Sequence, residues 1–572
     1  MSPFVRLAIV RLGDRICAQS VLLIVLGLMT LSYSGLPDSR IAELDFQTTR
    51  SLARLHAGDL EGTPEAERLV LNEDLLWQPN PGQFRSTRPL GGPIASIPFY
   101  WLGALFQSGL DELEAKHALS APSRLSEYAP HMAVGWKNSV LTAFLAWLVV
   151  LSARRIGVGR KHAWFSGLVF VLSSFVWPQA RGSSIEIQVA FFLFLAFHLL
   201  LRARERFERL RRPRRLDLVF IGFSLGMTFL TRPGIWPAIL ILAVAAVIAV
   251  FSGYRVLAKH ALFLRQTWRI GHWVDTLWIL LPLLVAIALT AVGNQARSGS
   301  FFGLPGELSP QLSMRSFSDL ALSLISPGRG LIWLAPLVLL APFGIAFGLN
   351  RGEKLWPLCV ILVGLPILWA AQTPLGADLP WGFGPGRLLA ALPFLWLGVA
   401  YALDRLSRKV WHRRACHALC AFGLLSSFSG VLVDTGTYQS LIGKLANSEL
   451  AELTEPESDY GERYRTVHWD LGLAEPWASW RILRHRLAVE GENFPAAQIF
   501  MLEESADEDV SVAIGPTLIS PETNRNLGFQ HMAWIDLNDR LETSPYPGML
   551  FSILLVGLGC IFAIRGLDRA LP

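Results

Sequence analysis

The feature that most constrains this chain is a series of apolar blocks, separated by charged or turn-forming residues. Each block is about 17–22 residues long, which is the length that crosses a hydrocarbon core of about 30 Å as an α-helix. The 572 residues are 52% hydrophobic and only 17% charged, whereas a soluble chain of this size would carry more charge. The sequence therefore predicts an all-α protein that crosses a membrane many times.

Arginine placement predicts the topology. One loop, 202–215, holds eight arginines, and further basic clusters lie near 154–161, 255–269 and 405–414. Basic loops stay in the cytoplasm, and all of these loops share one side only if the stretch 89–107 does not cross. Prolines and glycines interrupt that stretch, so we expect it to lie in the outer interface. The twelve expected spans are roughly 17–35, 132–153, 162–178, 185–202, 216–232, 234–252, 274–293, 330–349, 355–373, 387–404, 415–434 and 548–566.

This topology places both termini in the cytoplasm and divides the chain into three parts. Residues 1–434 form a transmembrane domain with a first external loop at 36–131. A second external segment, 435–547, precedes the last span and a cytoplasmic tail, 548–572. The pI of about 9.2 comes from arginines between the apolar blocks, so we expect no nucleic-acid partner.

The expected external loops repeat one combination, a carboxylate or an arginine beside prolines and glycines. The carboxylates are Glu43 and Asp45 after the first span and Glu186 at the start of another. The arginines are Arg85, Arg88, Arg181, Arg232, Arg329 and Arg387. A carboxylate here can take a proton from a hydroxyl, and arginines can bind phosphate through planar, charge-assisted hydrogen bonds. Snorkelling to lipid phosphates explains any single arginine equally well, but the convergence of five loops favours a site.

Six of these stretches occur as motifs in a recognisable order. They are Gln47–Leu52 with Gly58–Leu60, Arg85–Tyr100, Trp177–Glu186, Leu230–Pro233 (LTRP), Ser326–Leu331 (SPGRGL) and Phe383–Phe394. Together they resemble the GT-C class of integral-membrane glycosyltransferases, which use polyprenyl-phosphate-linked sugars. The chain is most similar to the bacterial branch related to protein O-mannosyltransferases and the lipid A aminoarabinose transferase, over about residues 15–435. It departs from the pattern by an extra glycine before Arg387 and by lacking a plain Asp-Glu pair in the first loop.

The resemblance implies a GT-C fold with interfacial jaw helices in the first external loop, set in a bacterial inner membrane. It implies transfer of a sugar, with inversion, from a polyprenyl-phosphate donor to a glycan, lipid or protein acceptor on the periplasmic face. Asp45 is the expected base, with Glu43 as the alternative. The expected substrate-binding residues are Glu186, Arg85, Arg88, Arg181, Arg232, Arg329, Arg387 and Tyr100. The sequence shows no metal motif or other cofactor site and leaves open a divalent cation between carboxylates and phosphate.

Two other functions remain open from the sequence. A transporter or flippase of lipid-linked sugars would use the same arginines without a base. A polymerase or ligase of lipid-linked glycans would place arginines and a histidine in a large late loop. The segment 435–547 does hold such a cluster: Arg463, Arg465, His468, Arg481, Arg484, His485 and Arg486. Trp477, Trp480 and Leu483 recur beside it at helical spacing, which predicts an amphipathic helix.

Overall fold

A computed structural model supplies the fold. It describes residues 3–33, 40–54, 76–80, 83–86, 88–117, 124–182, 184–260, 265–298, 301, 314–351, 355–372, 383–407, 409–433, 469, 474–488 and 546–568. The helices before residue 300 are α1 (Pro3–Leu31), α2 (Arg40–Ala53), α4 (Gly91–His117), α5 (Arg124–Arg155), α6 (Arg160–Leu172), α7 (Val176–Arg181), α8 (Ile185–Glu208), α9 (Arg215–Thr231), η2 (Pro233–Ile235), α10 (Trp236–His260) and α11 (Arg265–Ser298). Those after it are α12 (Met314–Ile325), α13 (Leu331–Leu334), η4 (Pro336–Leu340), α14 (Ala341–Asn350), α15 (Leu355–Gln372), η5 (Gly386–Ala390), α16 (Leu392–Leu406), α17 (Val410–Leu432), α21 (Glu475–Ala488) and α24 (Tyr546–Asp568).

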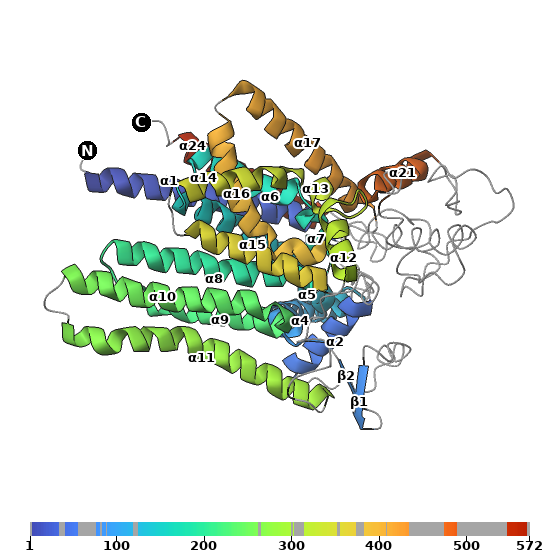
Figure 1. Ribbon diagram of the computed structural model, residues 1–572. Coiled ribbons are helices and arrows are strands. Elements are labelled where there is room, and N and C mark those ends of the chain that lie inside the picture. Colours follow the sequence, from blue (N-terminus) through green and yellow to red (C-terminus); the bar gives the residue numbers. More distant parts are fainter. Residues whose placement is uncertain are drawn as a thin grey trace.

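The long helices lie side by side in one bundle (Figure 1). Six of the described helices are long and apolar enough to cross a membrane, and three shorter apolar helices accompany them. The six are Gly13–Leu31, Ala129–Arg155, Ile185–Glu208, Pro233–Leu257, Gly271–Gln295 and Val410–Leu432. The predicted helical, multispan fold is confirmed, whereas the count of twelve spans is not.

Two predicted spans are interrupted in the structure. The block 162–178 divides into α6 and α7, and the block 330–349 divides into α13, η4 and α14. Proline explains the second interruption, because Pro336 has no backbone N–H to continue a helix and opens a new turn. The helices beyond it pack closely: a Cβ placed on Gly344 would lie 1.8 Å from the carbonyl oxygen of Gly398. Small residues of this kind allow membrane helices to approach backbone to backbone.

The two ends of the bundle differ. Both termini lie at one end, while α2, the strands and α21 lie at the other (Figure 1). The strands β1 (Leu76–Asn80) and β2 (Gln83–Ser86) form a small antiparallel hairpin, in which Trp77 pairs with Arg85. The sequence did not predict this hairpin. It is the one sheet that the described residues form.

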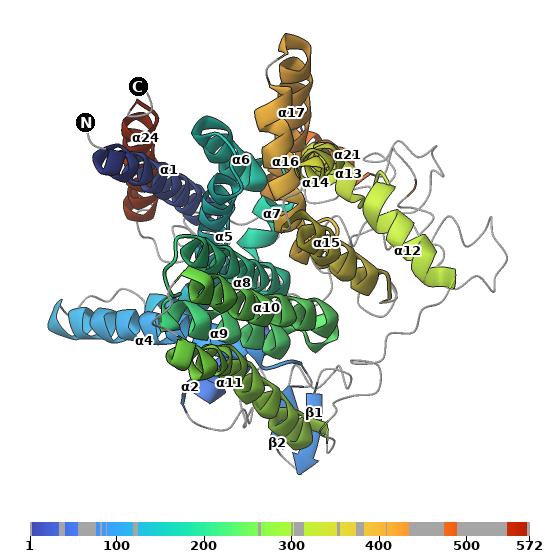
Figure 2. The same ribbon diagram turned by 60° about the vertical axis from the view of Figure 1, so that its left-hand side comes forward.

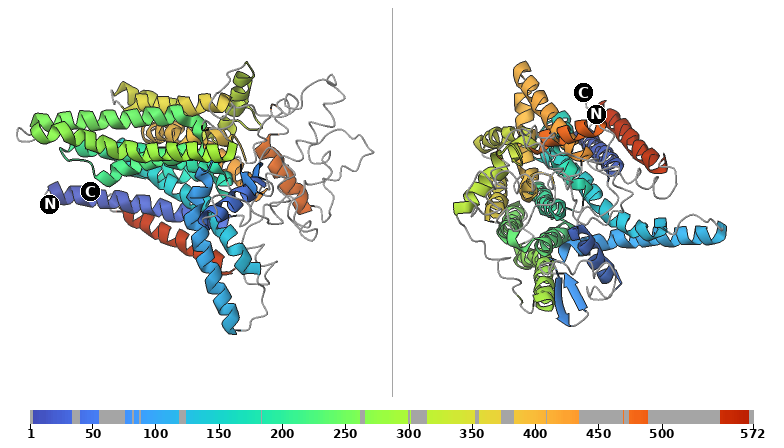
Figure 3. Two further views of the ribbon diagram at one scale, coloured as in Figure 1. Left: turned by 90° about the horizontal axis from the view of Figure 1, so that it is seen from below. Right: turned by 90° about the vertical axis from the view of Figure 1, so that its right-hand side faces the viewer.

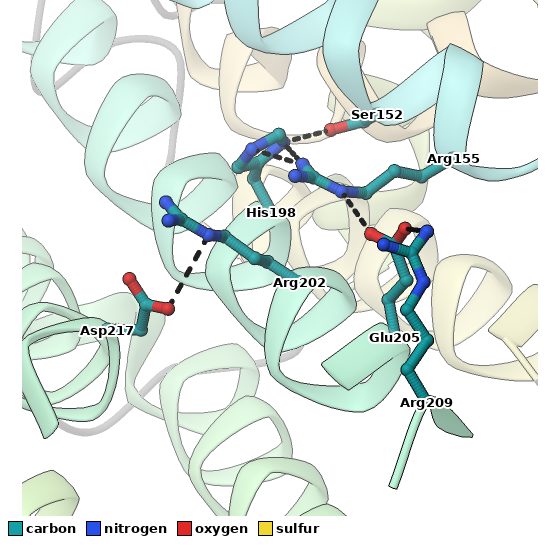
Figure 4. Close-up of polar contacts among 7 residues, drawn as sticks. All are labelled: Ser152, Arg155, His198, Arg202, Glu205, Arg209 and Asp217. Carbon is teal, nitrogen blue, oxygen red and sulfur yellow. Dashed lines mark hydrogen bonds and ion pairs between the residues drawn. The ribbon is translucent and has the colours of Figure 1, made fainter. Parts of the chain in front are cut away.

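The arginine-rich end is an ordered layer of ion pairs between helices (Figure 4). Arg155 of α5 lies 3.2 Å from Glu205 of α8, measured from Nε to Oε2, and Arg202 lies 3.5 Å from Asp217 of α9. The charge pattern predicted only which side these arginines occupy. The structure shows that several of them also join α5, α8 and α9.

The helix α4 lies crosswise to the bundle, reaching outward at the end that holds α2 (Figures 2 and 3). Its residues Trp101, Leu105 and Phe106 are at least half exposed. An apolar face beside a membrane-spanning bundle suits insertion at headgroup level. This orientation agrees with the prediction that the stretch 89–107 lies in the interface and does not cross.

We therefore expect a cysteine at Gln107 to react with an impermeant thiol reagent applied from the external side of the membrane. A cysteine at Arg209, which caps α8 at the arginine-rich end, is the matched control and should react only after permeabilisation. Labelling is measured by mass spectrometry against the native cysteines. Protection of position 107 from outside, with labelling from the cytoplasm, would reverse the topology and move the proposed site.

Candidate functional site

The helix α2 carries both predicted acids, and their surroundings differ. Glu43 is buried, accepts a 2.6 Å hydrogen bond from Nε2 of Gln47 one turn later, and lies 3.5 Å from Nε2 of His131. Burial by itself would raise the pKa of Glu43, but His131 and Gln47 outweigh it and hold that pKa below its ordinary value. Glu43 is therefore a carboxylate already engaged by neighbouring side chains.

Asp45 lies two residues further along, on a different side of the helix. Its side chain is 15% exposed, and its Oδ1 is 3.6 Å from Nε of Arg88. Burial raises the pKa of Asp45, while the positive charges of Arg88, Lys137 and Arg232 oppose that rise. A carboxylate with a raised pKa that remains partly open to solvent is better suited to accept a proton than one enclosed by partners. Of the two acids, Asp45 is the one whose surroundings suit it to accept a proton, and its role as a base stays a prediction.

Lys137 is a site residue that the sequence reasoning missed. It lies on α5, is buried, and donates a 2.7 Å hydrogen bond from Nζ to Oγ of Ser96 on α4. The signal was present, because a lysine inside the predicted span 132–153 is costly without a role. Asn138, the next residue, donates to the carbonyl oxygens of Gly182 and Ser184 at 2.7 and 2.9 Å. These bonds tie α5 to the turn that leads into α8.

Glu186 and Arg232 form an ion pair between the first turn of α8 and the end of α9. Among the described residues, the second oxygen of Glu186, Oε2, has no hydrogen-bond partner. The start of α4 also packs tightly against the end of α9: a Cβ on Gly91 would lie 2.3 Å from the backbone nitrogen of Thr231. Only glycine allows this approach, and it brings the Arg88 stretch next to Arg232.

The loop that leads into η5 also reaches this end. Nε2 of Gln179 donates a 2.7 Å hydrogen bond to the carbonyl oxygen of Phe383. A Cβ on Gly386 would lie 3.2 Å from the same nitrogen and 3.7 Å from Cγ of Glu186. Gly386 is part of the departure from the family pattern, and it belongs to the loop that carries the half-buried Arg387 close to Glu186. The sequence reasoning did not single out Gln179.

Four of the six predicted arginines divide into two groups by exposure. Arg88 and Arg232 keep 19% and 26% of their side chains exposed. Arg181 and Arg329 are only 1% and 3% exposed. The first of these buried arginines donates to the carbonyl oxygen of Ser32, and the second lies 3.4 Å from that of Gly384. Contacts with backbone carbonyls brace the loops, so direct binding of substrate by these two arginines stays a prediction.

The remaining predicted residues lie around the acids. Tyr100 is buried, with its ring centroid 6.1 Å from that of Phe46, which stacks on His131 at 3.4 Å. This contact joins α4, which carries Tyr100, to α2, which carries Phe46. Arg85 belongs to the hairpin, and its side chain lies outside the described residues. Among the described side chains, no group of three His, Cys, Asp or Glu residues is arranged to hold a metal ion.

The fold and site thus define a multispan membrane protein that gathers carboxylates and cations at one end of a helical bundle. A family model described as dolichyl-phosphate-mannose-protein mannosyltransferase matches residues 116–296. This match, which includes Lys137, Glu186 and Arg232, confirms the predicted resemblance over that segment. No curated protein sequence matches the chain.

Solved structures of two proteins are similar to this fold. ArnT from Cupriavidus metallidurans, bound to undecaprenyl phosphate, aligns with a TM-score of 0.40 at 15% identity, over 96% of this chain and 76% of that one. The archaeal oligosaccharyltransferase AglB from Archaeoglobus fulgidus, in complex with an inhibitory peptide and a dolichol-phosphate, aligns with a TM-score of 0.40 at 11% identity. That alignment covers 79% of this chain and 59% of AglB.

Proposed function

We propose that this protein is a membrane glycosyltransferase that moves a sugar from a polyprenyl-phosphate-linked donor to an acceptor hydroxyl on the external face of the membrane. The observation that carries the proposal is the setting of Asp45, a partly open carboxylate of raised pKa within the influence of Arg88, Lys137 and Arg232. A base beside several cations suits a reaction that deprotonates a hydroxyl and releases a phosphate. The family match over residues 116–296 supports the same class.

The reaction is a displacement at the anomeric carbon. The acceptor oxygen forms the new bond to that carbon, and its proton passes to Asp45. The bond between the sugar and the phosphate oxygen breaks, and the polyprenyl phosphate leaves with the electron pair. The cations stabilise the charge that develops on the leaving oxygen, because they are already in place before the reaction. Attack opposite the leaving group inverts the anomeric configuration.

The proposal is tested in a strain that lacks the protein, by mass spectrometry of envelope glycans and lipid-linked sugars. We expect one glycan modification to disappear and its lipid-linked donor to accumulate. Wild-type protein should reverse both changes, and the Asp45→Asn variant should reverse neither. Full rescue by Asp45→Asn would favour a flippase, which needs no base. Loss of whole glycan chains, with no loss of a single modification, would favour a polymerase or ligase.

The ion pair between Glu186 and Arg232 permits a separate prediction. Arg232→Met should lower stability in detergent by about 1–3 kcal/mol, because it leaves the buried carboxylate of Glu186 uncompensated. It should also weaken donor binding, by roughly ten- to a hundredfold for a lost charge-assisted contact. The double variant Glu186→Gln with Arg232→Met should regain stability but not donor binding. Unchanged donor binding in Arg232→Met would mean that this arginine serves only the fold.

A further inference from the structure

The helix α21 brings part of the segment 435–547 onto the bundle. Its ring contacts are with α17: Trp477 lies 6.4 Å from Phe422, and Trp480 lies 6.3 Å from Phe428, between ring centroids. Figure 1 shows α21 beside α13 at the end of the bundle that holds the site. The predicted amphipathic helix therefore forms, and its apolar side anchors it at this end.

Glu475, the first residue of α21, connects two of the motif loops. Its backbone N–H donates to the carbonyl oxygen of Gly328 at 3.3 Å. Its Oε2 accepts a 2.9 Å hydrogen bond from the backbone N–H of Gly384. The Glu475 side chain therefore points away from α21 and contacts the loop that leads to Arg387. Gly384 has a φ of +72°, a conformation that favours glycine, and a Cβ there would lie 2.7 Å from Leu334.

The burial of this carboxylate is costly. Glu475 is 1% exposed, and among the described residues its Oε1 has no hydrogen-bond partner. Burial raises the pKa of Glu475 to about 7, although the charge of Arg329 and the hydrogen bond from Gly384 act against that rise. A neutral amide could accept the same hydrogen bond without the cost of burying a charge. A buried acid in such a place is a candidate for a functional role.

We propose that Glu475 is a positioning residue of the transfer site, which latches the loop 383–386, and through it Arg387, to the loop that carries Arg329. This inference rests on the proposed function, and it assigns a task to the segment 435–547. The latch makes the position of Arg387 depend on α21. Among the described residues, Arg329 is the charged group that acts on Glu475, and α17 presents the aromatic rings of Phe422 and Phe428 to α21.

The latch should respond to pH in a definite direction. The closed latch has a pKa of about 7 at Glu475, and an open latch exposed to water would return it to its ordinary value of 4.5. Protonation of Glu475 stabilises the closed latch. This stabilisation is fully present at pH values below 4.5 and is lost as the pH rises through about 7. By this linkage the ratio of closed to open latch falls roughly thirtyfold between about pH 5.5 and about pH 8.5. Glu475→Gln cannot ionise and should stay closed throughout.

The first test measures hydrogen exchange of the peptide 383–391 without any substrate. In the wild type, protection should fall roughly thirtyfold relative to Glu475→Gln between about pH 5.5 and about pH 8.5. Glu475→Ala should lose protection at both values. Arg484→Gln, at an exposed position on the same helix, is the matched control and should behave as wild type. Unchanged protection in Glu475→Ala, or equal pH dependence in wild type and Glu475→Gln, would overturn the latch.

The second test measures the KM for the lipid-linked donor. Loss of the hydrogen bond that closes the latch should raise the KM of Glu475→Ala by about tenfold. Glu475→Gln should restore a low KM that no longer rises above about pH 7. A KM unchanged in Glu475→Ala would overturn the positioning role. If the wild type transfers no sugar while exchange in Glu475→Ala increases as expected, the proposed function fails and the latch between the two loops stands.

Discussion

Asp45→Asn is expected to abolish sugar transfer while the donor still binds. Asparagine keeps the size of the side chain and one acceptor oxygen, but it cannot take a proton from a hydroxyl at neutral pH. Removal of a general base typically lowers the rate by about 10²–10⁴-fold. Single-turnover rates and equilibrium binding of a polyprenyl-phosphate sugar separate the two effects.

Glu43→Gln is the matched control for that substitution. Glu43 is held by Gln47 and His131, so its loss should disturb α2 and lower the rate less than Asp45→Asn does. Near-normal turnover in Asp45→Asn combined with inactivity of Glu43→Gln would transfer the role of base to Glu43. If both variants remain active, the mechanism is wrong and a transport function gains support.

The second large effect is expected from Lys137→Met, which removes a buried positive charge that acts on Asp45. The charge of Lys137 opposes the rise in the pKa of Asp45, so its removal should raise that pKa further. A smaller fraction of Asp45 would then be ionised at neutral pH. We expect the rate at neutral pH to fall, because less of the base is then in the ionised form that accepts the proton.

The pH profile distinguishes this effect from a general loss of structure. The base is active when ionised, so the rate of the wild type should fall as the pH drops through the raised pKa of Asp45. In Lys137→Met this acid limb should move to higher pH, and part of the lost rate should return as the pH rises. Lys137→Arg keeps the charge and serves as the control. A rate that falls equally at every pH would refute the electrostatic role of Lys137.

The site was only partly predictable from the sequence. Asp45, Glu186 and Arg232 could be named because carboxylates and arginines next to span ends carry a recognisable signal. Lys137 carried a comparable signal within a span and was overlooked. Glu475 lies in a segment without a motif, and only its contact with Gly384 reveals it. No local pattern predicts a hydrogen bond between residues so far apart in the chain.

The sequence by itself determined the helical, membrane-spanning class, because block length and hydrophobicity are local properties that a bilayer selects directly. Arginine placement also predicted which loops share a side of the membrane, and that assignment stays a prediction; in the structure both termini lie at one end of the bundle (Figure 1). The tertiary structure alone decided which arginines remain partly open, as Arg232 does, and which brace loops, as Arg181 does. The same residue type in the same kind of loop serves either purpose. Which purpose it serves depends on burial and on partners from distant helices, and these exist only after the helices have packed.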